Sequence, residues 1–386
     1  MNEEQLRKYA IHLYLEGKNP SSICIELCKS RAWFYKWLNR YEQLLGGDWY
    51  KEQSRAPKIV TSKISPEIER LVINIRNQLK NNKYAQIGAI SIQWAMKKLG
   101  IEPPPIWTID RILKRHNLTR HKQSPPKKKN DYPGVKYCNV QQMDLVGPRF
   151  IKNYGRCYSF NIIDIESHCV QVNPIKSKST ESIVNAIIRF WQTFGIPDFL
   201  QMDNEMSFRG SNRHPHSFNL LIRLALAHDV TPIFIPQGEP WRNGIIEKFN
   251  DTFERKLFRT QEFIDLDDLR QKALEFEDFH NQYYRYKAHN HHTPLDMFNR
   301  NKPVVLLDNN YQLPENIPLI DGNIILIRFI RSNRKLNIWG ESFDVSKELV
   351  YSYVEAIISI NAQALKVYQD NKLIQEFRYL TPVDWL

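Results

Sequence analysis

Three acidic residues stand out because each interrupts or follows a stretch that otherwise reads as ordered and apolar. Asp144 lies in CNVQQMDLVG and Asp203 in DFLQMDNEMSF, and both segments have the pattern of buried β-strands. Glu247 lies in PQGEPWRNGIIEKFNDTF, where a turn rich in Pro and Gly opens an amphipathic helix. A carboxylate in a buried strand needs a reason, and metal binding supplies one.

Carboxylates from separate elements can hold two Mg²⁺ ions roughly 3.5–4 Å apart, one activating an attacking oxygen and one stabilising the leaving oxygen of a phosphodiester. Mg²⁺ prefers hard oxygen ligands and keeps several waters, so it needs few protein ligands. We therefore predict that Asp144, Asp203 and Glu247 are catalytic and bind two Mg²⁺ ions, with Mn²⁺ as a substitute. We expect no small-molecule cofactor.

The order MDLVG, QMDN and PWRNGIIEKFN resembles the Asp-Asp-Glu catalytic core shared by retroviral integrases and bacterial insertion-sequence transposases. The resemblance implies an α/β core of the ribonuclease-H-like fold over residues 133–300. In that fold the first and fourth strands are neighbours, which would place Asp144 beside Asp203. It further implies that Asn243 and Gly244 shape the turn before the helix and that Trp241 and Arg242 touch the substrate strand.

Other acids compete with these three. Spacing in the resembled family favours Glu239, since 35 residues separate it from Asp203 while 43 separate Glu247 from Asp203. We choose Glu247 because Glu239 precedes a proline, which disfavours helical backbone, whereas Glu247 holds the helix position of the motif. Asp164 also ends a strand, and Glu205 adds a carboxylate close to the site. We expect both to be bystanders or structural.

Positive charge is concentrated at the N-terminus. Residues 1–130 hold 25 Lys and Arg against 11 Asp and Glu, and the remainder holds 29 against 31. Lys and Arg contacts to phosphates supply the non-specific part of DNA affinity. This distribution predicts a DNA-binding region joined to a nearly neutral one.

Two helical modules are predicted in the basic region. Residues 1–45 read as three short helices of a helix-turn-helix, with Ser21 and Ser30 as caps, and residues 63–120 read as a second such unit in which Thr108 caps the last helix. The tandem pair resembles the end-recognition region of insertion-sequence transposases. A basic linker follows at residues 121–132. The predicted DNA-contacting residues are Arg31, Lys36, Arg40, Arg111, Lys114, Arg115, Lys127, Lys128 and Lys129.

Beyond residue 315 the sequence predicts an all-β region. Five short strands separated by turn formers suggest a small barrel over residues 315–386, which resembles the C-terminal SH3-like DNA-binding barrel of integrases. Arg328 and Arg331 are predicted to contact DNA there, although charges that protect a strand edge would look the same.

Length and composition set the broad class. At 386 residues the chain is expected to hold two to four domains. It has no 18-residue apolar run and no signal-peptide core, so we expect a soluble, cytoplasmic, nucleoid-associated bacterial protein. Five cysteines without a CxxC pair predict reduced thiols.

The sequence therefore predicts a multidomain DNA transposase, a Mg²⁺-dependent polynucleotidyl transferase. It would bind terminal inverted repeats on double-stranded DNA, cleave the 3′ ends and join them to target DNA, as a dimer or higher multimer. Two alternatives remain open. One is a catalytically silent DNA-binding regulator derived from a transposase, and the other is a simple nuclease acting on RNA·DNA hybrids.

Overall fold

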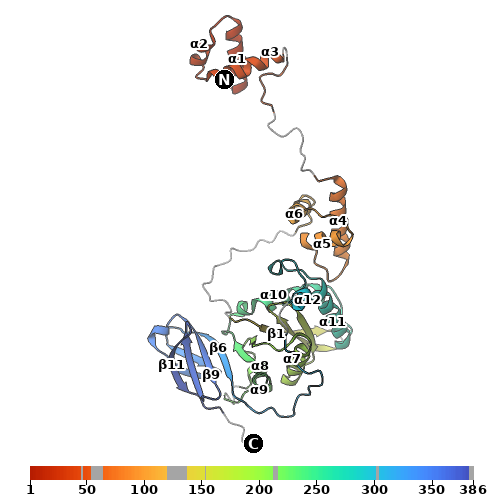
Figure 1. The fold of residues 1–386 in the computed structure, drawn as a ribbon, viewed down its shortest axis with the longest axis vertical. Helices are drawn as coiled ribbons and strands as arrows, with labels where there is room; N and C mark the ends of the chain where they lie inside the picture. The colour runs from red at the N-terminus through yellow and green to blue at the C-terminus, as the bar shows by residue number, and fades with distance from the viewer. Residues whose placement is uncertain are drawn as a thin grey trace. The chain divides into compact units, whose positions relative to one another are not determined.

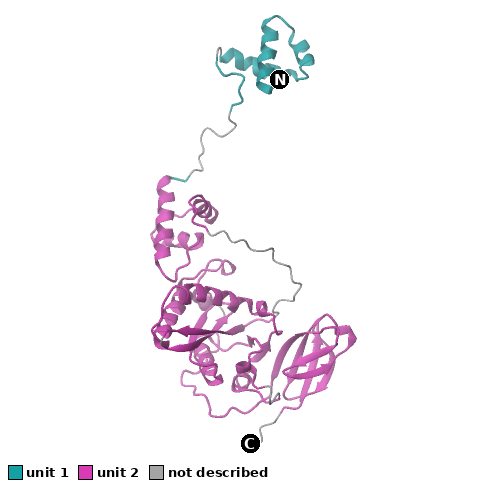
Figure 2. Cartoon of the chain, turned by 180° about the vertical axis from the view of Figure 1, so that it is seen from behind, with its two compact units in different colours: residues 1–65 teal, residues 66–386 magenta. Residues whose placement is uncertain are grey.

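The computed structural model describes residues 1–44, 47–53, 64–119, 137–152, 154–211, 216–300 and 304–381. The chain divides into two compact units, residues 1–65 and 66–386 (Figure 2). The predicted linker with Lys127, Lys128 and Lys129 lies outside the described residues. Within the described ranges, no helix has both the length and the apolar character needed to cross a membrane.

Unit 1 is a three-helix bundle made of α1 (Glu3–Leu15), α2 (Pro20–Glu26) and α3 (Arg31–Gln43). Ser30 caps α3 as predicted, accepting a hydrogen bond from the Trp33 N–H. The cap of α2 is Asn19 rather than Ser21, because the Asn19 side chain accepts from the Ser21 N–H and Pro20 occupies the first helical position. The buried residues of α3 are Phe34, Trp37 and Leu38.

Unit 2 begins with a second helical bundle, formed by α4 (Pro66–Asn81), α5 (Ala89–Lys98) and α6 (Ile106–Arg115). Helix α6 starts earlier than predicted. The Pro105 carbonyl accepts hydrogen bonds from the N–H groups of Thr108 and Ile109, so Thr108 lies inside the first turn instead of capping it. The three helices pack on one another through the buried residues Val72, Ile75, Ile92, Met96, Ile109, Ile112 and Leu113.

The next part of unit 2 is a mixed sheet (Figure 1). Strands β1 (Val140–Ile151), β2 (Gly155–Asp164) and β3 (Val170–Ile175) are antiparallel, while β4 (Phe199–Met202) runs parallel to β1 and β5 (Thr231–Phe234) parallel to β4. The resulting order is β3-β2-β1-β4-β5, in which the first and fourth strands are neighbours, as predicted for a ribonuclease-H-like core.

Helices cover both faces of this sheet because neighbouring residues of each strand point to opposite sides. On one face Phe160 and Ile162 pack with α7 (Thr180–Phe194) and α9 (Leu220–Ala227). On the other face Cys157 and Ile163 pack with α10 (Gly244–Phe253) and α11 (Leu266–Tyr283). The shorter helical elements are α8 (Met206–Arg209), α12 (Pro294–Arg300), the 3-10 helices η1 (Pro240–Asn243) and η3 (Lys287–His289), and the π-helix η2 (Glu254–Phe258).

The C-terminal β-region extends the core sheet. Its elements are β6 (Asn323–Phe329), β7 (Lys335–Ile338), β8 (Glu341–Asp344), η4 (Lys347–Leu349), β9 (Tyr353–Ser359), β10 (Ala364–Gln369) and β11 (Lys372–Arg378). The order β11-β10-β9-β6 continues into β5 through the parallel pairs Ile233↔Ile325 and Phe234↔Leu326.

The SH3-like barrel predicted for residues 315–386 is not confirmed. In the described part of the chain β11 pairs with β10 alone, and β7 and β8 form a separate hairpin, so the recorded pairing does not close a barrel. The stretch LNIWGESFDV is divided into β7 and β8 by a turn at Trp339 and Gly340, whose φ angles are 45° and 101°.

Two histidines, His280 in α11 and His289 in η3, are buried. His280 is 0% exposed, and its Nε2 lies 2.6 Å from the Tyr286 hydroxyl. The rings of His168 and His289 lie 4.2 Å apart beside the same tyrosine. Burial lowers the pKa of His280 to about 3, so its ring is neutral at pH 7.

Because His280 is buried in its neutral form, the stability of the fold should depend on pH, and His280→Gln should weaken that dependence. In the unfolded chain His280 becomes protonated below its ordinary pKa of 6.5, whereas in the folded chain it stays neutral until about pH 3. The neutral ring therefore stabilises the fold above pH 6.5, and this contribution is lost as pH falls, at up to about 1.4 kcal/mol per pH unit. Urea unfolding followed by circular dichroism between pH 7 and 4 should give a shallower loss for the variant than for wild type. Equal slopes would contradict the assignment.

Candidate active site

Asp144 and Asp203 lie at the same end of two neighbouring parallel strands. In the β1–β4 ladder Gln142 is opposite Gln201, and each aspartate follows its glutamine by two residues. Asp144 is still inside β1, whereas Asp203 is the first residue after β4. The equal offsets from the paired glutamines bring both aspartates to one edge, just beyond the end of the β1–β4 ladder.

Glu247 reaches this edge from the first turn of α10. The Ile246 N–H at the start of the helix donates to Gln142 Oε1 at 3.1 Å. Gln201 Nε2 donates to Asn243 Oδ1 at 3.0 Å, and Asn243 Nδ2 in turn donates to the Met143 carbonyl at 3.0 Å. The two strand glutamines and Asn243 therefore fix the start of α10 against the strands that carry the aspartates.

A second chain of hydrogen bonds orients Asp144. Asn250, one turn after Glu247, donates from Nδ2 to Asp144 Oδ2 at 2.7 Å. The Asn250 amide oxygen accepts from Asn161 Nδ2 at 2.8 Å, and Asn161 accepts from the Ser159 hydroxyl at 2.7 Å. Ser159, Asn161 and Asn250 are all buried, so this relay from β2 through α10 holds one carboxylate oxygen in a defined place.

The three acids interact electrostatically. Burial, followed by the negative charges of Asp203 and Glu247, raises the pKa of Asp144 to about 6. Burial also raises the pKa of Asp203, and partial burial together with the charge of Asp203 raises that of Glu247, the most exposed of the three. Three carboxylates that disfavour one another's ionised forms make a site that a bound cation would stabilise.

The donor set suits a hard divalent cation, because it consists of carboxylates with hydrogen bonds that orient them. The described residues do not contain a group of three or more His, Cys, Asp or Glu side chains already arranged as metal ligands. The three acids are thus electrostatic neighbours that do not form a closed ligand cluster.

The alternative glutamate is engaged elsewhere. Glu239 forms an ion pair with Arg242 and accepts a hydrogen bond from the Tyr353 hydroxyl at 3.0 Å. Glu247, by contrast, is among the charges that raise the pKa of Asp144. The placement favours Glu247 over Glu239 as the third acid.

Asp164 and Glu205 have distinct local roles. Asp164 Oδ1 accepts from both the N–H and the hydroxyl of Ser167, which shapes the turn between β2 and β3. The Glu205 N–H donates to Asp203 Oδ1 at 2.9 Å, and its carboxylate lies 3.0 Å from Lys178 Nζ. The positive charge of Lys178 opposes the rise in the pKa of Asp203.

In the N-terminal bundles, several predicted DNA-contacting residues are exposed. Arg31, Lys36, Arg111, Lys114 and Arg115 all lie on exposed positions of α3 and α6. Arg40 is half-buried and donates to the Lys51 carbonyl at 3.4 Å. Arg115 also forms an ion pair with Glu69 at 2.9 Å. Their contacts with DNA stay predictions.

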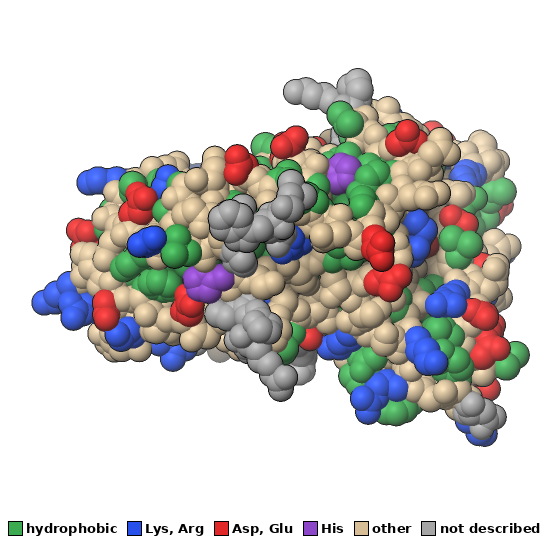
Figure 3. All heavy atoms as spheres, turned by 90° about the horizontal axis from the view of Figure 1, so that it is seen from below, with side chains coloured by type: hydrophobic (Ala, Val, Ile, Leu, Met, Phe, Trp, Pro, Cys, Tyr) green, Lys and Arg blue, Asp and Glu red, His purple; other side chains and the backbone are tan. Residues whose placement is uncertain are grey.

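The predicted contacts near the site and in the C-terminal region differ in accessibility. Trp241 is 57% exposed and Arg331 is exposed. Arg242 is buried against Tyr353, and Arg328 donates to the Phe234 and Ile235 carbonyls and to Asn204 Oδ1. A DNA contact by Arg242 or Arg328 would require these internal bonds to be given up, so the structure gives both a role in holding the fold. On the face drawn in Figure 3, basic and acidic side chains are interspersed rather than gathered by sign.

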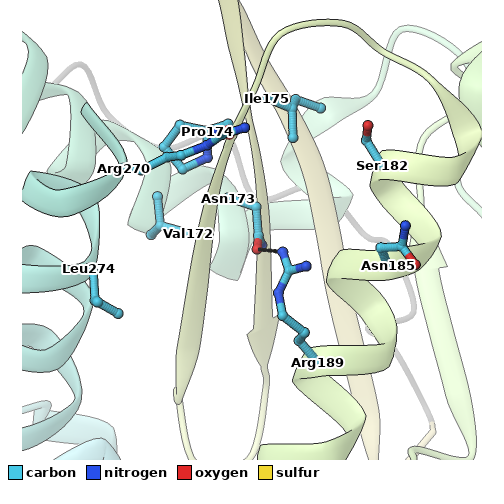
Figure 4. A pocket seen from close by; sticks show the side chains of 9 residues that line it. All are labelled: Val172, Asn173, Pro174, Ile175, Ser182, Asn185, Arg189, Arg270 and Leu274. Carbon is cyan, nitrogen blue, oxygen red and sulfur yellow. Dashed lines mark hydrogen bonds between the residues drawn. The ribbon is translucent and has the colours of Figure 1, made fainter. Parts of the chain in front are cut away.

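A pocket lies away from the acids, between β3, α7 and α11 (Figure 4). Arg189 and Arg270 line it, and the Arg189 guanidinium donates to Asn173 Oδ1 at 2.8 Å. None of the three acids lines this pocket, so we assign it no part in the chemistry.

Four residues that support the acids were missed in the sequence, namely Gln142, Gln201, Asn250 and Lys178. Three had a readable signal. Gln-Met-Asp occurs at both aspartates, so a polar residue precedes each within a buried strand, and Asn250 follows Glu247 by three residues on one helix face. Lys178 had none, because its partner Glu205 is 27 residues away.

Two segments match known protein families. Residues 228–294 match the integrase core domain, a segment that contains Glu247 and Asn250, and residues 1–46 match a homeodomain-like domain. The predicted helix-turn-helix character of the N-terminal region is thereby confirmed.

Solved structures with similarity to the chain include three retroviral integrases. The HTLV-2 integrase catalytic core domain in complex with magnesium is 14% identical, with 43% of this chain and 99% of that one covered and a TM-score of 0.31. A simian T-cell lymphotropic virus intasome in complex with PP2A regulatory subunit B56 gamma is 13% identical. The match covers 75% of this chain and 95% of that one, with a TM-score of 0.36. The BIV integrase catalytic core domain is 14% identical. The match covers 42% of this chain and 93% of that one, with a TM-score of 0.30.

Identities and TM-scores this low establish nothing about the activity, metal or partners of the chain. The matching segments and the strand order are more informative. Residues 228–294 match part of an integrase core domain, with which the strand order agrees, and residues 1–46 match a homeodomain-like domain; both are expected for a member of the transposase and integrase superfamily.

Proposed function

We propose that the protein is the DNA transposase of an insertion sequence. It binds the terminal inverted repeats of the element, cleaves at the 3′ ends and joins those ends to target DNA. The observation that carries the proposal is the meeting of Asp144, Asp203 and Glu247 at one edge of the sheet, in a chain that also has a homeodomain-like domain. The C-terminal β-region would add DNA contacts, and a dimer or larger multimer would hold two ends together.

The three acids would be the ligands of two Mg²⁺ ions. When bound, such ions activate the attacking oxygen and stabilise the leaving oxygen of a phosphodiester. The chain's own residues position the carboxylates: Asn250 orients Asp144, the Glu205 N–H orients Asp203, and Gln142 with Gln201 sets the approach of Glu247.

Each step is an in-line displacement at phosphorus. In cleavage a water oxygen bonds to phosphorus and the 3′-oxygen leaves. In joining the freed 3′-hydroxyl oxygen bonds to a target phosphorus and the 3′-oxygen of the target strand leaves. In each step the attacking oxygen loses its proton and the leaving oxygen gains one. Neither step needs a Ser, Tyr or His nucleophile, so we expect no covalent protein intermediate.

Loss of any one acid should abolish chemistry while sparing DNA binding. We expect Asp144→Asn, Asp203→Asn and Glu247→Gln each to reduce cleavage of end DNA by more than the ~100-fold typical for loss of an outer-sphere partner, because each removes a predicted ligand. Gel assays of cleavage and of binding on the same DNA separate the two effects. Glu239→Gln is the matched control and should retain cleavage. If Glu247→Gln retained cleavage and Glu239→Gln lost it, Glu247 would be refuted as the third ligand. A wild-type protein that binds end DNA but does not cleave it would favour the catalytically silent DNA-binding regulator.

Removing the amide that orients Asp144 should weaken metal binding specifically. For Asn250→Ala we expect the Mg²⁺ concentration at half-maximal cleavage to rise about 10- to 100-fold, as for other outer-sphere partners. Asn185→Ala, which removes an exposed amide on α7, is the control and should leave the Mg²⁺ dependence unchanged. An unchanged Mg²⁺ titration in Asn250→Ala would contradict the orienting role.

End recognition should depend strongly on salt. Residues 1–120 are expected to bind DNA from the ends of the element, with log K falling against log salt by about 0.9 per neutralised phosphate. Lys114→Ala, an exposed position on α6, should reduce that slope by about one. Fluorescence anisotropy at several salt concentrations measures both. Equal affinity for scrambled DNA at moderate salt would exclude end recognition.

A further inference from the structure

The loop between α4 and α5 joins the second helical bundle to the α/β core. Tyr84 in this loop is 4% exposed, although the loop connects two helices of the second bundle. The ring packs in the hydrophobic cluster of α10 and α11, with its centroid 5.5 Å from that of Phe276 in an edge-on geometry. Tyr84 therefore belongs to the core of the α/β domain rather than to that of its own bundle.

Hydrogen bonds fix the same loop on several sides. The Tyr84 hydroxyl donates to the Lys272 carbonyl at 3.1 Å, and the Tyr84 carbonyl accepts from the Tyr284 hydroxyl at 2.9 Å. Lys256, in the π-helix that extends α10, donates to the Ala85 carbonyl at 2.7 Å.

The next loop residue makes a reciprocal pair. Gln86 Oε1 accepts from the Arg285 N–H at 2.8 Å, and Gln86 Nε2 donates to the Arg285 carbonyl at 3.3 Å. The side-chain amide thus bonds the backbone after α11 in the manner of a neighbouring strand. Backbone groups paired in this way resist displacement, since each would otherwise lose a partner.

Charged contacts surround this centre. Lys83 Nζ lies 3.0 Å from Glu275 Oε2 on α11, the Arg285 guanidinium lies 3.6 Å from the centre of the Trp94 ring on α5, and the Lys98 ammonium lies 5.0 Å from that of Tyr283. Each cation–π or ionic contact of this kind contributes little stability by itself, but together they restrict the orientation in which Tyr84 and its loop pack on the core.

The docked loop is also close to the chemistry. Phe249 and Phe253 share the hydrophobic cluster of Tyr84, and both lie on α10, the helix that presents Glu247. The bundle that the loop anchors carries α6, with Arg111 and Lys114 exposed. One buried contact therefore connects the helix predicted to read DNA with the helix predicted to complete the active site.

We propose that residues 83–86 are a docking element that sets the distance between the bases read by α6 and the phosphate that is cleaved. The proposal rests on the proposed function. Tyr84, Ala85 and Gln86 act as positioning residues: they hold two DNA-contacting parts in one geometry and touch neither substrate nor reacting atoms. Loss of the contact would leave each part folded but would let the cleavable phosphate shift relative to the acids.

The test is a map of the cleavage position on end DNA with the full-length chain. In Tyr84→Ala we expect near-normal affinity for end DNA, but cleavage at the wild-type phosphate reduced by about 10²-fold, the loss typical of a misplacement of about 1 Å. Cuts at neighbouring phosphates should increase in proportion. Tyr84→Phe keeps the ring and loses the hydroxyl bond, so it should show a smaller version of both effects.

A second variant guards against misfolding of Tyr84→Ala. Lys83→Glu combined with Gln86→Ala keeps the Tyr84 ring and should scatter the cuts in the same way, while Gln282→Ala, an exposed glutamine on α11, should not. If both loop variants cut at the wild-type phosphate with wild-type rate, the docking role is overturned. If the wild-type chain itself fails to cleave end DNA, the proposed function fails instead, so the two failures are distinguishable.

Discussion

The site depends on two buried glutamine side chains. Gln142 and Gln201 sit opposite each other on parallel strands, and both direct their amides at the junction where η1 becomes α10. A buried amide without a partner costs about 1–3 kcal/mol, so the strands and the helix start are held in a single register. Through that register Asp144, Asp203 and Glu247 reach the same edge of the sheet.

Bringing three acids together opposes folding, and the structure offsets the cost only in part. Hydrogen bonds from Asn250 and from the Glu205 N–H favour the ionised aspartates, and Lys178 adds a positive charge. The pKa of Asp144 is still raised to about 6. Local conflict of this kind is typical of functional sites, where a site arranged for a ligand is less stable without it. In the function we propose, a divalent cation would supply the missing positive charge.

Local patterns in the sequence predicted the parts of the fold that depend on local chemistry. The apolar strand runs and the Ser30 cap were predicted because alternation and capping are visible in short windows, while the adjacency of β1 and β4 followed from the family resemblance. The C-terminal region was predicted less well. Whether its strands close on themselves or join β5 depends on contacts such as Arg328 with the Phe234 carbonyl, which link residues 94 positions apart.

The same distinction applies to the site. Asp144, Asp203 and Glu247 were chosen from their strand and helix contexts, whereas the support from Lys178 and the burial of Tyr84 arise from long-range packing. Arg242 and Arg328 differ from these, because both were predicted to contact DNA from their positive charge, whereas the structure shows each guanidinium bonded inside the fold; their DNA contacts stay predictions. Charge can be read from a sequence, but the partner of a charge requires the structure.

The most direct test of the central claim is a crystal structure of the chain grown with Mn²⁺, with the metal located by anomalous scattering. The account predicts Mn²⁺ bound by carboxylate oxygens of Asp144 and Asp203, with Glu247 turned toward the metal, and no such density in Asp203→Asn. Mn²⁺ bound elsewhere, or no Mn²⁺ between these acids at concentrations that support cleavage, would contradict it.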